Sequence, residues 1–314
     1  MGNRTTIVDI AKAAGVSKSL VSLAIRNDPG VSATTRERIL RIADELGYRS
    51  NIWARSLVRG KTGIVGVLLT DLSNPYHTDV VNGVEDAARD VGLSVLISHG
   101  RHAPELLSEQ VRQFASLAVD GIVVISAHTP ADALEDVAKL TPVVVVGRPA
   151  SLPEGVSWIR NDDELGAQIA TRHLLDRGRK RIGFLQNSGS VSAVSRRDSY
   201  VATMEAASLE PRVLVPDDVD RESLRELDGV VAANDRGAVW VLGEASDAGL
   251  RVPEDLAIVG YDNSQLSRIV RPQLSSVDQP RLAMGRRALE ILRGGDVVRE
   301  VFEPELVVRG SSGG

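Results

Sequence analysis

The sequence predicts a small all-α domain with a helix-turn-helix at the N-terminus, followed by a two-lobed α/β domain built from doubly wound parallel sheets. The first sixty of the 314 residues contain three short helix patterns in succession. From Gly63 onward, short β-branched runs alternate with amphipathic helix patterns, which is typical of parallel sheets covered by helices on both faces. The stretch from residue 62 to residue 310 is too long for one comfortable sheet, so two lobes are the economical arrangement.

Each of the three N-terminal helices has a capping residue. Thr6 can cap the first, with Asp9 three residues later in the manner of a capping box. Gly15 ends that helix, Ser17 can cap the second and Ser32 the third. The positions expected to face inward are Ile7, Ile10, Ala11 and Ala14; Val21, Ala24 and Ile25; and Ile39, Ile42, Ala43 and Leu46.

Two helices joined by a short turn containing Gly, and braced by a third, form a helix-turn-helix whose second helix enters the major groove of DNA. Lys18 can donate to guanine O6 and N7, Ser19 can pair with several base edges, and Leu23 can contact only a thymine methyl. The alternative is a three-helix bundle with a solvated face. Leu20 and Leu23 fall off the expected buried face, where exposed leucines need a partner, so DNA binding is favoured.

The charge is distributed unevenly along the chain. Residues 1–61 hold eleven Lys and Arg against five Asp and Glu, a net charge of +6, whereas the remainder holds 26 against 37, a net charge of −11. A basic segment on an acidic body indicates that the segment meets a polyanion, although chance clustering is the alternative. Arg36 or Lys61 is expected to contact phosphate rather than bases.

The stretches Thr6 through Ser17, Val21-Ser22, Val31-Ser32 and Leu46-Gly47-Tyr48 resemble the N-terminus of the lactose-repressor (LacI) family. Asn51 through Leu57 resembles that family's hinge helix, whose paired leucines wedge into the minor groove. There are departures, because Ser50 replaces the usual proline, and Leu20 and Leu23 replace the usual threonine and arginine. The DNA-binding residues implied in all are Thr6, Ser17, Lys18, Ser19, Ser22, Leu23, Asn27, Ser32, Asn51, Ala54 and Leu57.

The body contains seven expected strands and five expected helices. Ligands in such sheets bind beyond the carboxyl ends of the strands, and here those ends offer many donors and acceptors rather than one catalytic pair. The strands are Ile64–Leu69, Leu93–Ser98, Gly121–Ile125, Val143–Val146, Arg181–Leu185, Gly229–Ala232 and Leu256–Val259, and the helices are Thr78–Val91, Glu105–Leu117, Leu165–Arg177, Arg196–Ala207 and Gly237–Ala248.

The body also carries stretches such as Asn74-Pro75-Tyr76, Ala233-Asn234-Asp235 and Val259-Gly260-Tyr261-Asp262, which resemble the LacI family's effector domain, a periplasmic-binding-protein-like fold. The resemblance runs in family order from about residue 5 to residue 310. Arg196 is expected to begin a helix with its planar fork free to hold two hydroxyls or a phosphate. For each ligand residue the alternative is a cap, a turn or an inter-lobe salt bridge. The effector-binding residues implied are Asn74, Tyr76, Arg148, Arg196, Asn234 and Asp262.

Several classes of protein are disfavoured. Without cysteine there is no disulfide, no thiolate zinc site and no cysteine nucleophile, and the five histidines form no H-x-x-x-H pair, so neither a metal site nor a cofactor is expected. The phosphate-binding and nucleophile-elbow motifs of common enzymes are missing, which argues against catalysis. No apolar run is long enough for a membrane span and no export signal is evident, so a cytoplasmic location is expected rather than a secreted sugar-binding protein.

The resulting expectation is a sequence-specific transcriptional regulator, and a repressor rather than an activator. It binds operator DNA as a homodimer and responds to a small polar effector, with a sugar favoured over a purine. Its expected parts are residues 1–49 (helix-turn-helix), 50–61 (hinge helix and linker), 62–310 (effector-binding and dimerisation domain, with lobes 62–157 plus 281–303 and 158–280 plus 304–310) and 311–314 (unstructured tail).

Overall fold

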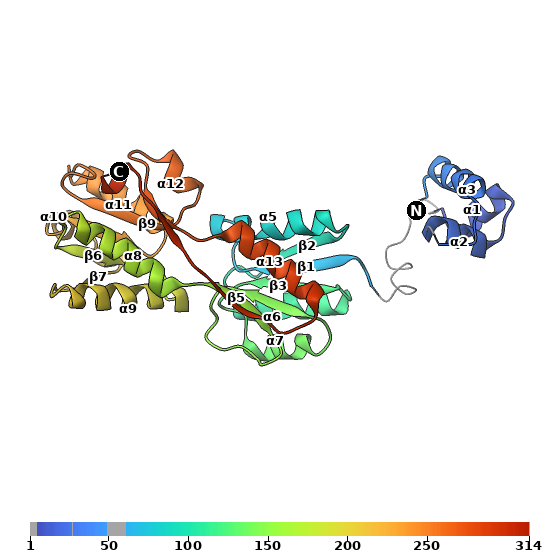
Figure 1. Ribbon diagram of the computed structural model, residues 1–314, viewed down its shortest axis with the longest axis horizontal. Coiled ribbons are helices and arrows are strands. Elements are labelled where there is room, and N and C mark those ends of the chain that lie inside the picture. The colour runs from blue at the N-terminus through green and yellow to red at the C-terminus, as the bar shows by residue number, and fades with distance from the viewer. Residues whose placement is uncertain (1–4, 27, 49–60, 314) are drawn as a thin grey trace. The chain divides into compact units, whose positions relative to one another are not determined.

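The computed structural model describes residues 5–26, 28–48 and 61–313 (Figure 1). The chain divides into two compact units, Met1–Thr62 and Gly63–Gly314, and each is described by itself.

The first unit is a three-helix domain whose start and turns are fixed by local hydrogen bonds. The backbone amide and the hydroxyl of Thr6 both donate to the Asp9 carboxylate, at 2.8 and 2.7 Å. Gly15 ends the first helix with a φ of 61°, a left-handed conformation that glycine adopts without steric cost. Ser17 and Ser32 each accept a hydrogen bond from the backbone amide three residues on, at 3.1 and 3.3 Å, as N-caps do. The helices are α1 (Ile7–Ala14), α2 (Lys18–Arg26) and α3 (Ala33–Glu45).

The core of this domain differs from the expectation at two leucines of α2. Leu20 and Leu23 are half-buried and pack against the cluster that contains Ile10, Val21 and Ile39. The expectation that they stand free on the surface is wrong, because α2 packs against both α1 and α3 and therefore buries a wide stripe. Leu20 and Leu23 are therefore no evidence for a partner on this surface.

The second unit contains two six-stranded sheets. All neighbours in the first sheet are parallel, in the order β11-β5-β4-β3-β1-β2. Two helices, α5 and α13, cover one face, and α6 and α7 cover the other (Figure 1). The central strands are apolar along their whole length because both faces are buried. The elements are β1 (Ile64–Leu69), α5 (Pro75–Asp90), β2 (Ser94–His99), α6 (Pro104–Ser116), β3 (Gly121–Ile125), α7 (Ala131–Ala138), β4 (Val143–Val146), β5 (Ser157–Asn161), α13 (Arg281–Gly294) and β11 (Arg299–Phe302).

The second sheet has the order β12-β10-β9-β8-β6-β7, and only its edge strand β12 is antiparallel to its neighbour. Helices α8 and α9 cover one face, and α10 and α11 cover the other. The elements are α8 (Asp163–Asp176), β6 (Ile182–Leu185), α9 (Val191–Ala206), β7 (Arg212–Leu214), α10 (Arg221–Arg225), β8 (Gly229–Ala232), α11 (Asp235–Asp247), β9 (Ala257–Asp262), α12 (Gln265–Ile269), β10 (Ser275–Asp278) and β12 (Glu305–Val307), with a 3-10 turn at Pro216–Asp218.

The expected strands and helices of the body are present, four of the strands with the expected bounds and the other elements with shifted ends, and the structure adds elements that the sequence pattern did not reveal. The most consequential is β5, which pairs with β4 and β11 in the first sheet. The second lobe, expected to begin at residue 158, therefore begins after Asn161. The strand was missed because its residues, Ser-Trp-Ile-Arg-Asn, are mostly polar.

The chain passes between the two sheets three times, after β5, after β10 and between β11 and β12. Its second passage leads into α13, which lies along α5 although the two helices are about two hundred residues apart in sequence. The helices approach closely because Gly83 and Gly285 face each other's backbones. A Cβ on Gly83 would overlap the carbonyl of Leu282, and one on Gly285 would overlap the carbonyl of Val80.

The expectation of an unstructured tail is wrong for the residues described. Gly310–Ser312 forms a 3-10 turn in which Ser311 and Ser312 are buried. Ser311 Oγ donates to the Ile258 carbonyl at 2.6 Å and accepts from the Ser275 amide at 2.8 Å. Small hydroxyl side chains can satisfy buried backbone groups, so the Gly/Ser sequence here packs against the beginnings of the interior strands β9 and β10 rather than forming a loose end.

The close approach of α5 and α13 leads to a stability prediction. We expect Gly285→Ala to lower the free energy of unfolding by about 1–3 kcal/mol, because the added methyl group forces two backbones apart. Gly294→Ala, in the same helix with open space around it, serves as the control and should change stability by less than about 1 kcal/mol. Urea unfolding followed by circular dichroism measures both, and equal effects of the two substitutions would contradict the close-packing argument.

Candidate functional site

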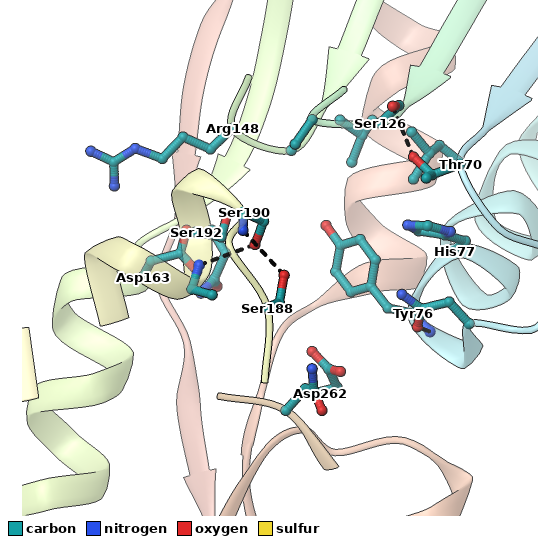
Figure 2. A pocket seen from close by; sticks show the side chains of 18 of the residues that line it. Thr70, Tyr76, His77, Ser126, Arg148, Asp163, Ser188, Ser190, Ser192 and Asp262 are labelled. Atoms are coloured by element: carbon teal, nitrogen blue, oxygen red, sulfur yellow. Dashed lines mark hydrogen bonds between the residues drawn. The ribbon is translucent and has the colours of Figure 1, made fainter. Parts of the chain in front are cut away.

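A polar cavity lies where the carboxyl ends of both sheets face each other in the second unit. Its volume is about 190 Å³. Tyr76 and His77 lie on the first-lobe side, opposite Ser188 and Ser190 of the second lobe (Figure 2). The structure brings all six of the expected effector-binding residues to this cavity, namely Asn74, Tyr76, Arg148, Arg196, Asn234 and Asp262. That they contact a ligand stays a prediction.

Asn74 and Tyr76 occupy the first turn of α5. Asn74 is the N-cap of the helix, and its Oδ1 accepts from the Tyr76 amide at 3.0 Å. The alternative role expected for Asn74, that of a helix cap, is therefore present. The Tyr76 ring projects into the cavity (Figure 2). Burial, reinforced by the carboxylate of Asp163, raises the pKa of the Tyr76 hydroxyl above its ordinary value. Tyr76 therefore presents a neutral ring and a hydroxyl to the cavity.

Arg196 is tied to the protein more completely than the sequence indicated. It lies one and a half turns into α9, which begins at Val191, rather than at the helix start. Its Nε and Nη2 each lie 2.8 Å from Oδ1 of Asp163, and its Nη1 donates to the Ala233 carbonyl at 2.6 Å. Its Cζ is 3.6 Å from the ring centroid of Tyr261. The expectation of a free guanidinium fork is wrong, because the Asp163 carboxylate occupies it.

The charge state of this pair follows from its surroundings. Arg196 and Asp163 are 8% and 2% exposed. Burial alone would lower the pKa of Arg196, but the adjacent Asp163 carboxylate more than compensates and raises it. Replacing Arg196 by alanine would leave Asp163 as an unpaired buried charge, so this change tests folding more than ligand binding.

Arg148 forms a bridge between the lobes. Its Nη1 lies 2.6 Å from Glu164 Oε1 and donates to Ser195 Oγ at 2.7 Å, and both partners belong to the second lobe. Its guanidinium points away from Tyr76 (Figure 2). Partial burial acts to raise the pKa of Glu164, but hydrogen bonds from Ser195 and Arg148 outweigh it and hold that pKa at about 2. The inter-lobe salt bridge, left open as an alternative, is therefore present.

Asn234 and Asp262 form the second-lobe side. Asn234 caps α11 by accepting from the Gly237 amide at 2.9 Å, and it exchanges amide hydrogen bonds with Asn187. Asp262 has a φ of 106°, which is strained for any residue with a Cβ, and accepts from Gln279 Nε2 at 2.6 Å. Burial raises the pKa of the Asp262 carboxyl to about 7, since the nearby arginines offset the burial only in part.

Other cavity residues were missed by the sequence reasoning. His102 follows β2, and Ser126 and His128 follow β3, so the rule that ligands bind beyond strand ends would have found them had it been applied to these two strands. Asn161 and Gln279 could not be found in that way, because the strands that carry or precede them were not recognised. Asp163 was not predicted as a cavity residue because its partner Arg196 is 33 residues away in the sequence.

The expected DNA-facing residues of the first unit are placed as follows. Lys18 and Ser19 are exposed on the first turn of α2, whereas Ser22 and Leu23 are half-buried. Thr6, Ser17 and Ser32 are exposed, and each is also used at a helix start. Asn27, Asn51, Ala54 and Leu57 lie outside the described residues.

Arg36, one of the two expected phosphate contacts, has a structural role. Its Nη2 donates to the Asp28 carbonyl at 2.5 Å, and its Nε is buried without a hydrogen-bond partner in the described part of the chain. Lys61 is exposed.

Two kinds of feature are missing from the described residues. No helix there is long and apolar enough to cross a membrane. No group of three or more His, Cys, Asp or Glu side chains there could hold a metal ion.

The two units define a class of protein in which a helix-turn-helix domain is joined to a two-lobed α/β domain with a polar cavity between its sheets. Residues 6–51 match the model of bacterial regulatory proteins of the lacI family, and residues 171–312 match that of a periplasmic binding protein-like domain. Catabolite control protein A of Priestia megaterium is 30% identical over 302 residues, covering 91% of each chain. The chain belongs to the LacI family of bacterial regulatory proteins, which are DNA-binding transcriptional regulators.

Solved structures agree with this assignment. The complex of the transcriptional regulator CelR with cellobiose is 30% identical, covers 98% of this chain and 100% of its own, and superposes with a TM-score of 0.70. The Lac repressor dimer bound to operator and the anti-inducer ONPF covers 99% of both chains with a TM-score of 0.86. Its identity is 24%, so it shows the shared fold.

The raised pKa of Asp262 predicts how stability depends on pH. An aspartate in the unfolded chain has a pKa of about 3.9, so the folded protein binds the carboxyl proton of Asp262 more tightly than the unfolded chain does. The stability that this proton contributes is lost as the pH rises from about 4 through 7. Asp262→Asn cannot ionise. We expect its stability relative to the unaltered protein to improve by more than about 1 kcal/mol between pH 5 and pH 8.

Urea unfolding at the two pH values measures this change. The control is Asp255→Asn, because a hydrogen bond from Arg251 lowers the pKa of Asp255 to about 2, and this carboxylate is ionised at both pH values. Its effect should be the same at pH 5 and pH 8. An Asp262→Asn effect that is equally constant would show that this carboxyl is ionised throughout.

Proposed function

We propose that this regulator is a repressor that binds a pseudo-palindromic operator as a homodimer and responds to a sugar or sugar derivative. The observation that carries the effector part is the cavity between the sheets, where polar side chains from both lobes converge. A site of this kind suits a small polar molecule with several hydroxyl groups. A protein that acts on operator DNA works in the cytoplasm, so we place it there.

The DNA-binding part rests on α2. Lys18 and Ser19 stand exposed on its first turn, the part of a recognition helix that leads into the major groove. One such helix reads only a few base pairs, so a two-fold dimer that reads two half-sites supplies the specificity. The operator-bound Lac repressor, which has the same fold, is a dimer. By family resemblance, Leu57 acts as a wedge in the minor groove at the centre of the operator.

The sugar is favoured over a purine on two grounds. The cavity offers hydroxyl, amide and carboxyl groups in Ser188, Asn234 and Asp262, which can both donate to and accept from sugar hydroxyls. CelR, at 30% identity over nearly the whole chain, was solved with cellobiose. A purine stacked on Tyr76 remains the other candidate, because an aromatic ring can pack against either ligand.

Control of DNA binding would come from the relative orientation of the lobes. The ion pair from Arg148 to Glu164 crosses the mouth of the cavity and joins the lobes in this arrangement. A ligand between the lobes shifts the balance of arrangements only by its difference in affinity for them, typically about 1–3 kcal/mol. A difference of this size in free energy is enough to change the affinity of a repressor for its operator by about ten-fold.

The proposal for DNA is tested by selecting operators from a random DNA pool. We expect a two-fold symmetric sequence. Lys18→Ala should relax one position in each half-site and weaken binding by about 1–3 kcal/mol, because a base contact is lost. Lys12→Ala, an exposed change in the last turn of α1, removes the same charge away from the recognition helix and should leave the selected sequence unaltered. Selection of an asymmetric site, or of the same site by Lys18→Ala, would count against the assignment.

The effector proposal is tested at Tyr76 by calorimetry with a panel of sugars and purines. We expect one sugar to bind and to change operator affinity. Tyr76→Ala should weaken that sugar by about ten- to one-hundred-fold, because the ring packs against its apolar face. Leu72→Ala is the matched control, since Leu72 is 54% exposed in the loop before α5 and does not line the cavity. A ligand that Tyr76→Ala binds unchanged would have its site elsewhere.

A further inference from the structure

The two walls of the cavity differ in charge. The second-lobe wall contributes the carboxyl groups of Asp163 and Asp262. On that wall Arg196 is paired with Asp163. Among the described residues that line the cavity from the first lobe, none is acidic and five are basic, namely His77, His102, His128, Arg160 and Arg148, of which Arg148 is paired with Glu164. A neutral sugar gives no reason for such a division, because hydroxyl groups pair equally well with either wall.

Two of the histidines stand together at the mouth. His102 follows β2 and His128 follows β3, and their ring centroids are 6.4 Å apart in an edge-on arrangement. Both side chains are exposed, and His102 Nε2 lies 3.5 Å from Oδ2 of Asp71. The Asp71 carboxylate also accepts from Ser73 Oγ at 2.8 Å and lies 3.9 Å from Arg236 Nη1, so it is shared among several donors.

The third histidine lies deeper. Its Nδ1 is 2.8 Å from the Asp71 carbonyl, which fixes the His77 ring against the loop that follows β1. Burial lowers the pKa of His77, with smaller contributions in the same direction from His102 and His128. The three imidazoles line the same part of the first-lobe wall, so their N–H groups can converge on one anionic group.

The backbone holds His102 at this wall under strain. Arg101 and His102 have φ values of 49° and 61°, two successive side-chain-bearing residues in the left-handed region. Such conformations cost free energy and persist where the surroundings impose them, often at ligand sites. Here the His102 amide donates to the Thr70 carbonyl at 3.3 Å, which ties the strained turn to the end of β1.

Arg160 adds a full positive charge to the same wall. Its guanidinium lies 5.2 Å from the ring centroid of Trp158, and its Nε is buried without a hydrogen-bond partner in the described part of the chain. No carboxylate of the described residues forms an ion pair with it. Arg196 and Arg148, by contrast, are each neutralised by a carboxylate within 3 Å.

We propose that the effector is a sugar that carries an anionic group, either a phosphate or a carboxylate. The anion lies against the first-lobe wall at His102 and His128, and the hydroxyl groups face Asp262 on the second lobe. This proposal rests on the proposed function, because it assumes a sugar effector. Imidazole can donate N–H to an anion, whereas the second-lobe wall places against the ligand the Asp262 carboxyl, which suits a hydroxyl group better than an anion.

The test uses matched triples of one sugar in neutral, phosphorylated and acidic form, such as glucose, glucose 6-phosphate and glucuronate, and the same for galactose and mannose. Calorimetry with the full-length chain measures each affinity. We expect at least one charged member to bind about ten-fold or more tightly than its neutral parent. The phosphate and carboxylate arms distinguish the two anions.

Variants then locate the preference. The double change His102→Gln and His128→Gln should reduce the advantage of the charged sugar over its neutral parent to less than about three-fold. His99→Gln, a first-lobe histidine of β2 that does not line the cavity, should keep the full advantage.

Each result has a distinct meaning. Binding of neutral sugars with no gain from a charge, or a preference that survives the double change, overturns the anionic-sugar inference and leaves the proposed sugar effector standing. Failure of every sugar to bind, with binding of a purine, overturns both.

Discussion

The buried ion pair between Arg196 and Asp163 is the interaction on which the second lobe's side of the cavity depends. Two charges removed from water are stable only when each is fully partnered, and loss of one partner from such a pair typically costs about 3–5 kcal/mol. The pair joins the first turn of α8 to α9 and, through the Ala233 carbonyl, to the end of β8. Tyr261 stacks beneath the guanidinium, and its hydroxyl accepts from Asn161 Nδ2 at 2.8 Å. Gly166 completes the arrangement, because a Cβ there would overlap that hydroxyl.

The ion pair inside the second lobe differs in burial from the ion pairs that join the two lobes. Within the second lobe, Arg196 and Asp163 are buried and held by several partners. Across the mouth, the contacts from Arg148 to Glu164 and from Asp71 to Arg236 are partly exposed. Exposed ion pairs contribute little stability, so they can be exchanged when the lobes move. The buried ion pair therefore lies in the second-lobe wall of the cavity, and the partly exposed ion pairs join the two lobes.

The sequence predicted the central part of each sheet because apolar runs such as Val143–Val146 are buried on both faces and leave an unambiguous pattern. It did not predict β5, β10 or β11, since an edge or a strand near the cavity carries polar side chains and loses that pattern. All six residues that the family resemblance implied line the cavity, in agreement with the rule that ligands bind beyond strand ends. The sequence did not predict that Arg196 is neutralised. Its partner Asp163 lies at the start of α8, and the two side chains meet only because α8 packs against α9. Leu20 and Leu23 were predicted to be exposed for a similar reason. Their burial depends on α2 packing against two other helices, α1 and α3, at the same time.

The interlocked glycines of α5 and α13 have a consequence for how the chain is made. The first lobe takes β1 to β5 from residues 64–161, but α13 and β11 come from residues 281–302. During synthesis, domains fold as the chain emerges, and the whole second-lobe segment from α8 to β10 leaves the ribosome before the first lobe can acquire its last helix and edge strand. Until then the apolar face that α13 covers, including Val80 and Val84 of α5, is open to solvent. The lobe that begins first is therefore finished last, and this apolar face stays uncovered until α13 has been translated.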